Sequence, residues 1–135
     1  MSVVTLPYRT PYDLRHPWFF WRHAVKLPVQ NFWQRGRRGW SVQDAWSADA
    51  HLARVISGMA DHIRDYGQGY PGELVTRDEW CSILDKISDG FKAHLDLFEM
   101  TYLDSPNAES ERYALVFRFT RGITLFTQWY GHLWD

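Results

Sequence analysis

Arginine and tryptophan residues gather in one stretch, residues 35–52, whose composition is typical of an anion-binding site. Arg35, Arg37 and Arg38 precede Ser41, a residue type that caps helix N-termini. The free N–H groups of a helix N-terminus favour an anion, and guanidinium groups bind phosphate or carboxylate through paired hydrogen bonds. Because Trp40 adds an aromatic surface beside these cations, the stretch predicts a site for an anionic ligand.

A nucleotide would suit such a site, because nucleobases stack on aromatic side chains such as Trp40, Trp46 and Tyr70. Arg118 and Arg121 lie in an otherwise apolar segment, where a buried guanidinium requires a partner. That partner is either an internal carboxylate, with Asp44 and Asp49 as candidates, or an anionic ligand, and the sequence leaves both open. The predicted ligand-binding set is Arg35, Arg37, Arg38, Trp40, Asp44, Trp46, Asp49, His51, Tyr70, Arg118 and Arg121.

The sequence contains no recognisable catalytic or metal-binding motif. Glu-x-x-His and His-x-x-x-His spacings are absent, and the single Cys81 cannot form a zinc site. Asp49 and His51 are two residues apart and would point in different directions on a helix. Cys81 lies near the expected start of a helix, and we interpret it as an unreactive thiol. We therefore predict no catalytic residue, no metal and no cofactor, which favours a binding protein over an enzyme.

The elements that must position these residues are predicted to be helices, with no strand of useful length. We expect one all-α domain over residues 1–135: an extended proline-containing arm at 1–17, a basic aromatic segment at 18–38, and a helical core at 40–134. Within the basic segment, Pro28 is expected to end or kink the first helix. The core is expected to be a compact bundle of three long helices, at about 41–66, 76–102 and 108–134, with the aromatic segment beside it.

Capping residues and apolar periodicity support these boundaries. Ser41 with Asp44, and Thr76 with Glu79, have capping-box spacing. The glycine-rich residues 67–72 match G-x-G-x-x-G, but a helix precedes them and Pro71 follows, so we expect a plain loop. The buried face of the first long helix is predicted to contain six apolar residues, Leu52, Val55, Ile56, Met59, Ala60 and Ile63. The apolar stripe of the second long helix is predicted to contain Trp80, Ile83, Leu84, Ile87, Phe91, Leu95, Phe98 and Tyr102.

The last helix is apolar on nearly all sides between Tyr113 and Trp134. A helix of this kind is buried either at the centre of a fold or by a second subunit. Because a small domain cannot easily cover every side of a terminal helix, we expect a homo-oligomer. The aromatic segment at 18–38 is expected to dock on its own domain, with adsorption to a membrane surface as the alternative.

Charge is distributed unevenly along the chain, although the formal net charge is only −1. Residues 1–40 contain seven Lys or Arg and one Asp, whereas residues 41–111 contain five Lys or Arg and fourteen Asp or Glu. Such a layout suggests a basic arm matched to an acidic body and gives no strong nucleic-acid signal. With one cysteine, no signal peptide and no long apolar run, we expect a cytoplasmic protein without a transmembrane segment.

The central motif resembles one found in an uncharacterised group of small proteins encoded by bacteriophages and prophages. It reads Arg37-Arg38-Gly39-Trp40-Ser41-x-x-Asp44-x-Trp46-Ser47-x-Asp49-x-x-Leu52. Two later stretches fit the same group, namely Gly69-Tyr70-Pro71 and Glu79-Trp80-x-x-Ile83-Leu84-x-x-Ile87-x-x-Gly90-Phe91. This chain departs from the group at Ala50-His51 and in the extension from Ala108 to Asp135.

The resemblance implies a phage-encoded accessory protein that acts in the host cytoplasm. Such a protein would sequester a nucleotide immune signal or block a host defence protein. The alternatives are a nucleotide-processing hydrolase and a small phage structural or interaction protein.

Overall fold

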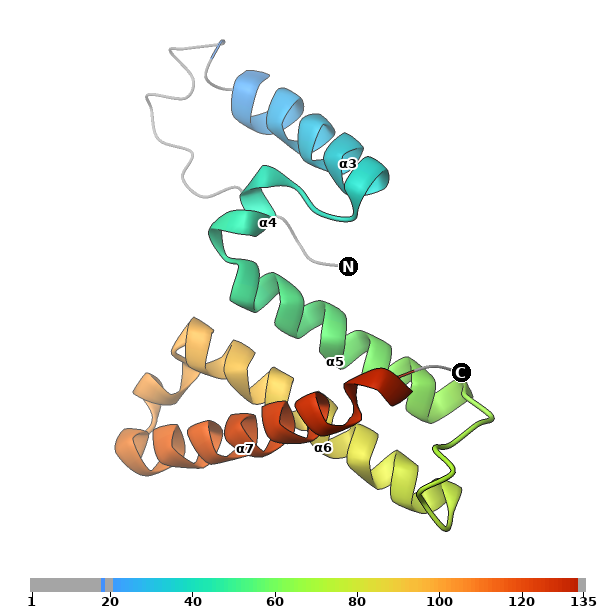
Figure 1. Cartoon of the computed structure of the whole chain (residues 1–135). Helices are drawn as coiled ribbons and strands as arrows, with labels where there is room; N and C mark the ends of the chain where they lie inside the picture. Colours follow the sequence, from blue (N-terminus) through green and yellow to red (C-terminus); the bar gives the residue numbers. More distant parts are fainter. Residues whose placement is uncertain (1–17, 19–20, 134–135) are drawn as a thin grey trace. The chain divides into compact units, whose positions relative to one another are not determined.

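The computed structural model describes residue 18 and residues 21–133, all of its regular elements being helical, which confirms the predicted all-α class (Figure 1). The chain divides into two compact parts, the N-terminal part at residues 1–47 and the C-terminal part at residues 48–135. Each part is described by itself below. The predicted single domain over 1–135 therefore stays a prediction, and the expected arm at 1–17 lies outside the described residues.

The N-terminal part consists of a π-helical turn, Arg22–Lys26, followed by α3, Leu27–Arg38, and α4, Val42–Trp46. Of the two outcomes predicted at Pro28, an end or a kink, the structure excludes an end of the helix, because the helical segment runs through this residue. Pro28 lies in the first turn of α3, where its missing N–H is least costly. The N–H of Leu27 bonds the carbonyl of Arg22, five residues back, so the wider π turn accommodates the proline.

A tight turn joins α3 to α4. Gly39 has a left-handed backbone with φ of 82°, and its N–H bonds the Arg35 carbonyl at 2.8 Å, which ends α3. Ser41 then caps α4 by accepting the Asp44 N–H, and the Asp44 side chain accepts the Ser41 N–H, so the predicted capping box is confirmed. The prediction of one continuous helix from 41 to 66 is wrong, because Ser47 leaves helical geometry with φ of −131° and ψ of 55°.

The C-terminal part contains three long helices, α5 at Ala48–Tyr66, α6 at Arg77–Glu99 and α7 at Ala108–Trp129. Short 3-10 helices follow α6 at Thr101–Asp104 and α7 at Tyr130–His132. Helices α5 and α7 each pack against α6, which is therefore the central helix of this part (Figure 1). The predicted loop over 67–72 is confirmed as non-helical, and the predicted cap at Thr76 accepts the Glu79 N–H at 3.3 Å.

The core of the C-terminal part forms around the buried side chains of α6, as its predicted apolar stripe implied. Trp80 contacts Trp129 of α7 edge to face, with ring centroids 5.8 Å apart. Phe91 meets two phenylalanines of α7 in the same geometry. The buried cluster comprises Ala53, Ala60, Trp80, Leu84, Ile87, Phe91 and Trp129.

Small residues form the inner face of α5, which corrects the prediction for that helix. Its buried positions are Ala50, Ala53, Ser57 and Ala60, at the i, i+3, i+4 spacing of one face. Of the six residues predicted there, Ala60 is buried and Ile56 and Ile63 are partly buried, whereas Leu52, Val55 and Met59 are exposed. A face of small side chains lets two helices approach closely. The positions of the larger apolar residues therefore did not indicate which side of α5 is buried.

The backbones of α6 and α7 touch at a pair of glycines. A Cβ atom built on Gly90 would lie 2.6 Å from the Gly122 Cα and 2.8 Å from the Arg118 carbonyl oxygen. A Cβ atom on Gly122 would in turn lie 2.7 Å from the Gly90 Cα. Because no side chain fits at either position, these glycines fix how closely the two helices pack.

None of the helices in the described segments combines the length and the apolar composition needed to cross a bilayer.

Candidate functional site

The predicted binding stretch is first of all the connection between α3 and α4. Arg35 donates two hydrogen bonds to Asp44, from Nε to Oδ2 at 2.8 Å and from Nη2 to Oδ1 at 2.5 Å. Asp44 also accepts the Ser41 N–H at 2.8 Å. Its carboxylate therefore closes the turn from both sides, and one of the predicted ligand-binding arginines is engaged within the chain.

Polar side chains on one side of α3 add to this connection. The Gln34 side-chain oxygen accepts the Val42 N–H at 2.8 Å, and Asn31 donates to Gln43 at 2.5 Å. The Asn31 and Gln34 side chains are both half-buried and lie one turn apart on α3. The polar side of α3 therefore packs toward α4, which leaves its apolar side to face outward.

The pKa of Asp44 is held well below its ordinary value. The Arg35 hydrogen bonds are the largest cause, and the bonds from Ser41 add to them, while burial acts in the opposite direction. The carboxylate is therefore charged at every pH near neutrality, so this pair is a permanent feature of the turn.

The other predicted cations of this stretch remain at the surface. Arg38 stacks on Trp40, with the guanidinium carbon 3.8 Å from the ring centroid, and donates to the Trp40 carbonyl at 3.1 Å. Arg37 is exposed on α3 and makes no ion pair within the described part of the chain. Trp46, also predicted as a binding residue, is 86% exposed.

A face of large apolar side chains lies on α3 opposite its polar side. Val29 is 62% exposed, Phe32 80% and Trp33 69%. Two of these three are aromatic, yet the predicted site did not include them. Their spacing of three and four residues indicates a common side of the helix but not whether that side is exposed, and we call these three residues the aromatic face of α3.

Positive charge surrounds the aromatic face. Between residues 18 and 43 the sequence contains five Lys or Arg and no Asp or Glu. No carboxylate within residues 18–43 can therefore neutralise these cations, and Asp44, just beyond them, pairs with Arg35. The combination of exposed aromatics and uncompensated cations favours contact with a partner that is both apolar and acidic.

The remaining predicted residues lie in the C-terminal part. Asp49 of α5 bonds His94 of α6, with Oδ2 and Nε2 2.9 Å apart. This hydrogen bond is the main cause that lowers the pKa of Asp49. Asp49 therefore links α5 to α6. Of the other two residues, His51 is partly buried on α5, and Tyr70 lies in the loop after that helix with 42% exposure.

Arg118 and Arg121 both pair with Asp89, across the α6–α7 contact. Arg118 donates from Nε at 3.0 Å and from Nη2 at 2.5 Å, and Arg121 donates from Nη2 at 3.3 Å. These bonds, with Arg118 the largest cause, lower the pKa of Asp89. The two arginines thus have an internal partner, although it is neither Asp44 nor Asp49, the carboxylates that the sequence suggested.

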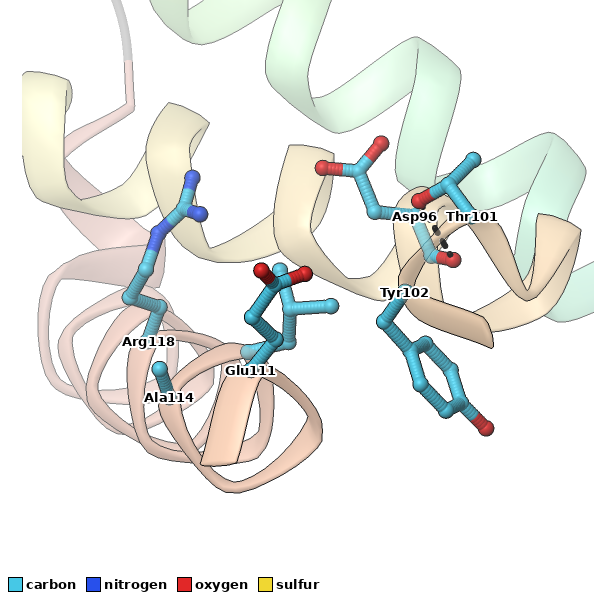
Figure 2. A pocket seen from close by; sticks show the side chains of 7 residues that line it. Asp96, Thr101, Tyr102, Glu111, Ala114 and Arg118 are labelled. Atoms are coloured by element: carbon cyan, nitrogen blue, oxygen red, sulfur yellow. Dashed lines mark hydrogen bonds between the residues drawn. The ribbon is translucent and has the colours of Figure 1, made fainter. Parts of the chain in front are cut away.

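A shallow hollow of about 290 Å³ lies beside Arg118 (Figure 2). Asp96 of α6 and Glu111 of α7 line it together with that arginine, while the Tyr102 ring points away from the guanidinium (Figure 2). Ser105 donates to Glu111 at 2.5 Å, so this carboxylate is also engaged. With two acidic groups and one guanidinium that Asp89 already binds, the hollow does not favour a phosphate.

Among the described residues, no group of three or more His, Cys, Asp or Glu side chains could hold a metal ion. Comparison of the chain with protein-family models, with curated proteins and with solved structures found no match. The candidate site therefore depends on geometry alone, and its strongest feature is the aromatic face of α3.

Proposed function

We propose that this is a phage-encoded accessory protein that binds a host protein through the aromatic face of α3 and thereby blocks it. It acts in the host cytoplasm, as a homo-oligomer. The phage origin is inferred from the sequence resemblance. One structural observation carries the binding role, which is the exposure of Val29, Phe32 and Trp33 in a segment that contains four cations besides the paired Arg35.

A protein partner suits this face better than a small ligand. Protein interfaces are enriched in tryptophan, phenylalanine and arginine, and their strongest contacts are aromatic side chains that enter pockets on the partner. A convex helix face cannot enclose a nucleotide, whereas it can enter a groove. The cations at its edges favour a groove with an acidic rim and speed association with it.

The arginines support this choice over nucleotide sequestration or hydrolysis. Arg35 is bound to Asp44, and both Arg118 and Arg121 are bound to Asp89, so a phosphate would have to displace a carboxylate in each case. Arg37 and Arg38 remain available as edge contacts for an acidic partner. The joining of the aromatic segment and the three long helices into one bundle also belongs to this proposal.

Site-specific photo-crosslinking in bacteria tests the proposal. A benzophenone amino acid replaces Trp33, and in a matched control it replaces Gln30, an exposed polar residue on the flank of the same helix. We expect a discrete crosslink to a host protein from position 33 and little from position 30. The crosslink should disappear when Phe32→Ala is added, because neighbouring interface aromatics act together.

Three outcomes would overturn the proposal. Crosslinks from position 33 that return only residues 48–135 of the same chain would mean that α3 docks on its own domain. A mass shift with a pool of cyclic and linear nucleotides in native mass spectrometry, lost in Arg37→Ala or Arg38→Ala, would support nucleotide sequestration instead. A nucleotide released in altered form would support the hydrolase.

A further inference from the structure

The side of α7 that points away from α6 is largely apolar between Tyr113 and Tyr130, with Arg121 and Gln128 at its edge, and Arg121 is paired with Asp89. Phe117 is 68% exposed, Val116 40% and Ile123 39%, and both terminal tyrosines of the stretch exceed 60%. Their spacing of three and four residues places them on one side of the helix. We call this surface the outer face of α7, and it comprises Tyr113, Val116, Phe117, Thr120, Ile123, Thr124, Thr127 and Tyr130.

The hydroxyl groups of the three threonines on the outer face have hydrogen-bond acceptors within α7 itself. Each hydroxyl donates to the carbonyl four residues earlier, Thr120 to Val116 at 2.8 Å, Thr124 to Thr120 at 2.7 Å, and Thr127 to Ile123 at 2.8 Å. With the hydroxyl bound to its own helix, a threonine side chain can be covered without losing a hydrogen bond. The outer face is therefore apolar and also ready for burial.

The inner face of α7 is already occupied by α6. Leu115, Gly122 and Trp129 are buried there, and Phe119 and Phe126 contact Phe91. A helix that is apolar on both sides is normally covered on both sides. Within the described C-terminal part only one side is covered, because α5 packs against α6 and not against α7.

We propose that the outer face of α7 packs antiparallel against the same face of a second copy of this chain, around a twofold axis near residue 122. This deepens the oligomer stated in the proposed function, and it does not depend on what α3 binds. An isologous contact requires a surface that complements itself. Reversal about residue 122 sets Tyr113 against Gly131 of the partner subunit and Phe117 against Thr127 of the partner subunit.

This register places large side chains opposite small ones along the central row of positions 113, 117, 120, 124, 127 and 131. At its centre Thr120 meets Thr124 of the partner subunit, so two small residues allow the helices to approach closely at the axis. The row has its two aromatic residues in the first half and small residues in the second, so each aromatic residue meets a small one when the row is reversed. Arg121 lies at the edge of the contact, where Asp89 of its own chain pairs with it.

The area is of the right size for a dimer. An aromatic side chain can bury about 150–250 Å². The exposed fractions of Tyr113, Phe117 and Tyr130, which lie between 61% and 68%, correspond to roughly 400 Å² per subunit on that scale. The aliphatic and threonine side chains between the aromatic residues add to this exposed area. The total approaches the area that each partner buries in a standard interface, which is about 800 Å².

A second exposed apolar stripe lies on α5, where it contains Leu52, Val55 and Met59. Met59 therefore provides a matched control position, because it is as exposed as Phe117 and lies on a different helix of the same part.

Sedimentation equilibrium of the full chain tests the dimer, with Thr124→Arg and the control Met59→Arg. We expect the wild-type chain and the control to have twice the 16.0 kDa monomer mass. Thr124→Arg places like charges at the axis, which should weaken association by at least about 100-fold. Its circular dichroism should stay helical, because Thr124 bonds only its own helix.

A charge pair tests the antiparallel register. Phe117→Lys and Thr127→Glu should each weaken the dimer, and the combined variant should regain it, because each lysine then faces the glutamate of the partner subunit. The two positions are ten residues apart on one helix, so they cannot pair within a subunit.

Three results would overturn the inference. The first is a wild-type chain that is monomeric at about 100 µM, a concentration at which a weak micromolar dimer would still form. The second is a dimer that Met59→Arg disrupts and Thr124→Arg does not. The third is a monomer whose outer face is protected from hydroxyl-radical labelling, which would mean that another segment of the same chain covers it. None of these would alter the photo-crosslinking result for α3.

Discussion

Asp44 combines three roles in a single carboxylate, because it accepts from Arg35, completes the cap of α4 and closes the turn after Gly39. Several residues of the motif at residues 37–52 are thus explained by local structure. Gly39 provides the left-handed residue, and Ser41 provides the cap. The turn does not explain Trp46, which is 86% exposed.

Removal of this carboxylate's charge should open the turn without unfolding the C-terminal part. In Asp44→Asn we expect amide hydrogen exchange over residues 41–45 to rise by about 5- to 30-fold, which corresponds to about 1–2 kcal/mol for a cap and a half-exposed ion pair. Hydrogen exchange with mass spectrometry measures this. Asp104→Asn, at an exposed carboxylate without an ion pair in the described chain, is the control and should change nothing near the turn.

The same carboxylate gives a pH dependence with a definite sign. Its pKa is lowered in the folded chain, so its contribution to stability is complete above the unfolded value of about 4 and is lost as pH falls further. Carbon-13 NMR of the Asp44 carboxyl should therefore show a titration midpoint well below the ordinary aspartate value of about 4. A midpoint at that ordinary value would mean that the Arg35 pair does not persist in solution.

At the scale of elements, the α6–α7 contact depends on the absence of side chains. Gly90→Ala should destabilise the chain by about 1–3 kcal/mol, because its Cβ would lie 2.6 Å from the Gly122 Cα and the backbones would have to separate. Urea denaturation measures the change. Gly58→Ala is the matched control, since nothing lies within 4 Å of its added Cβ, and it should stabilise α5 by up to about 1 kcal/mol.

Trp80 contributes to the core through its size and not through its polar group. The side chain is 1% exposed, and its indole N–H has no hydrogen-bond partner among the described residues. Trp80→Ala should therefore cost about 3–5 kcal/mol in thermal or urea unfolding, while Trp80→Phe should cost clearly less. Equal losses in the two variants would indicate that the N–H is satisfied in solution.

The sequence predicted the helices well where capping residues and apolar periodicity coincide. The caps at Ser41 and Thr76 are confirmed, as is the α6 stripe from Trp80 to Phe91. The inner face of α5 could not be predicted, because alanine and serine are neutral in a hydrophobic pattern and acquire meaning only from the proximity of α6. The break at Ser47 likewise has no strong local signal.

The candidate site was predicted only in part, for a related reason. Arginine types and spacing identified cations that do cluster near the turn, but the partner of each cation depends on tertiary contacts. The pairing of Arg118 with Asp89 joins residues 29 positions apart. Exposure of Phe32 and Trp33 was equally inaccessible, because a helix with two different faces does not reveal from its sequence which one is covered.

At the scale of the whole molecule, self-association should appear in the thermal stability. If the outer face of α7 is buried in a dimer, the melting temperature of the wild-type chain should rise with protein concentration, since only the folded chain dimerises. That of Thr124→Arg should stay constant. Differential scanning calorimetry over a 50-fold concentration range would separate the two, and parallel curves would contradict the dimer.

A dimer would also present two copies of the aromatic face of α3. A host target with two sites, or an oligomeric target, would then be held by both copies, and linked sites raise the apparent affinity by orders of magnitude when geometry permits. Thr124→Arg should in that case weaken binding to an oligomeric target and leave binding to a single isolated site unchanged. Phe32→Ala should weaken binding in both cases. Surface plasmon resonance on sparse and dense target surfaces would measure the difference.

Gly90 and Gly122 also constrain the mutational paths open to this chain. Each residue excludes a side chain at the other, so the first substitution must separate α6 from α7 and bears most of the cost. Once the helices are apart, the second glycine no longer faces a backbone, and its replacement should cost much less than it would alone. A double-mutant cycle should therefore be strongly non-additive. Variation at one of these positions would then become tolerable mainly after the other has changed.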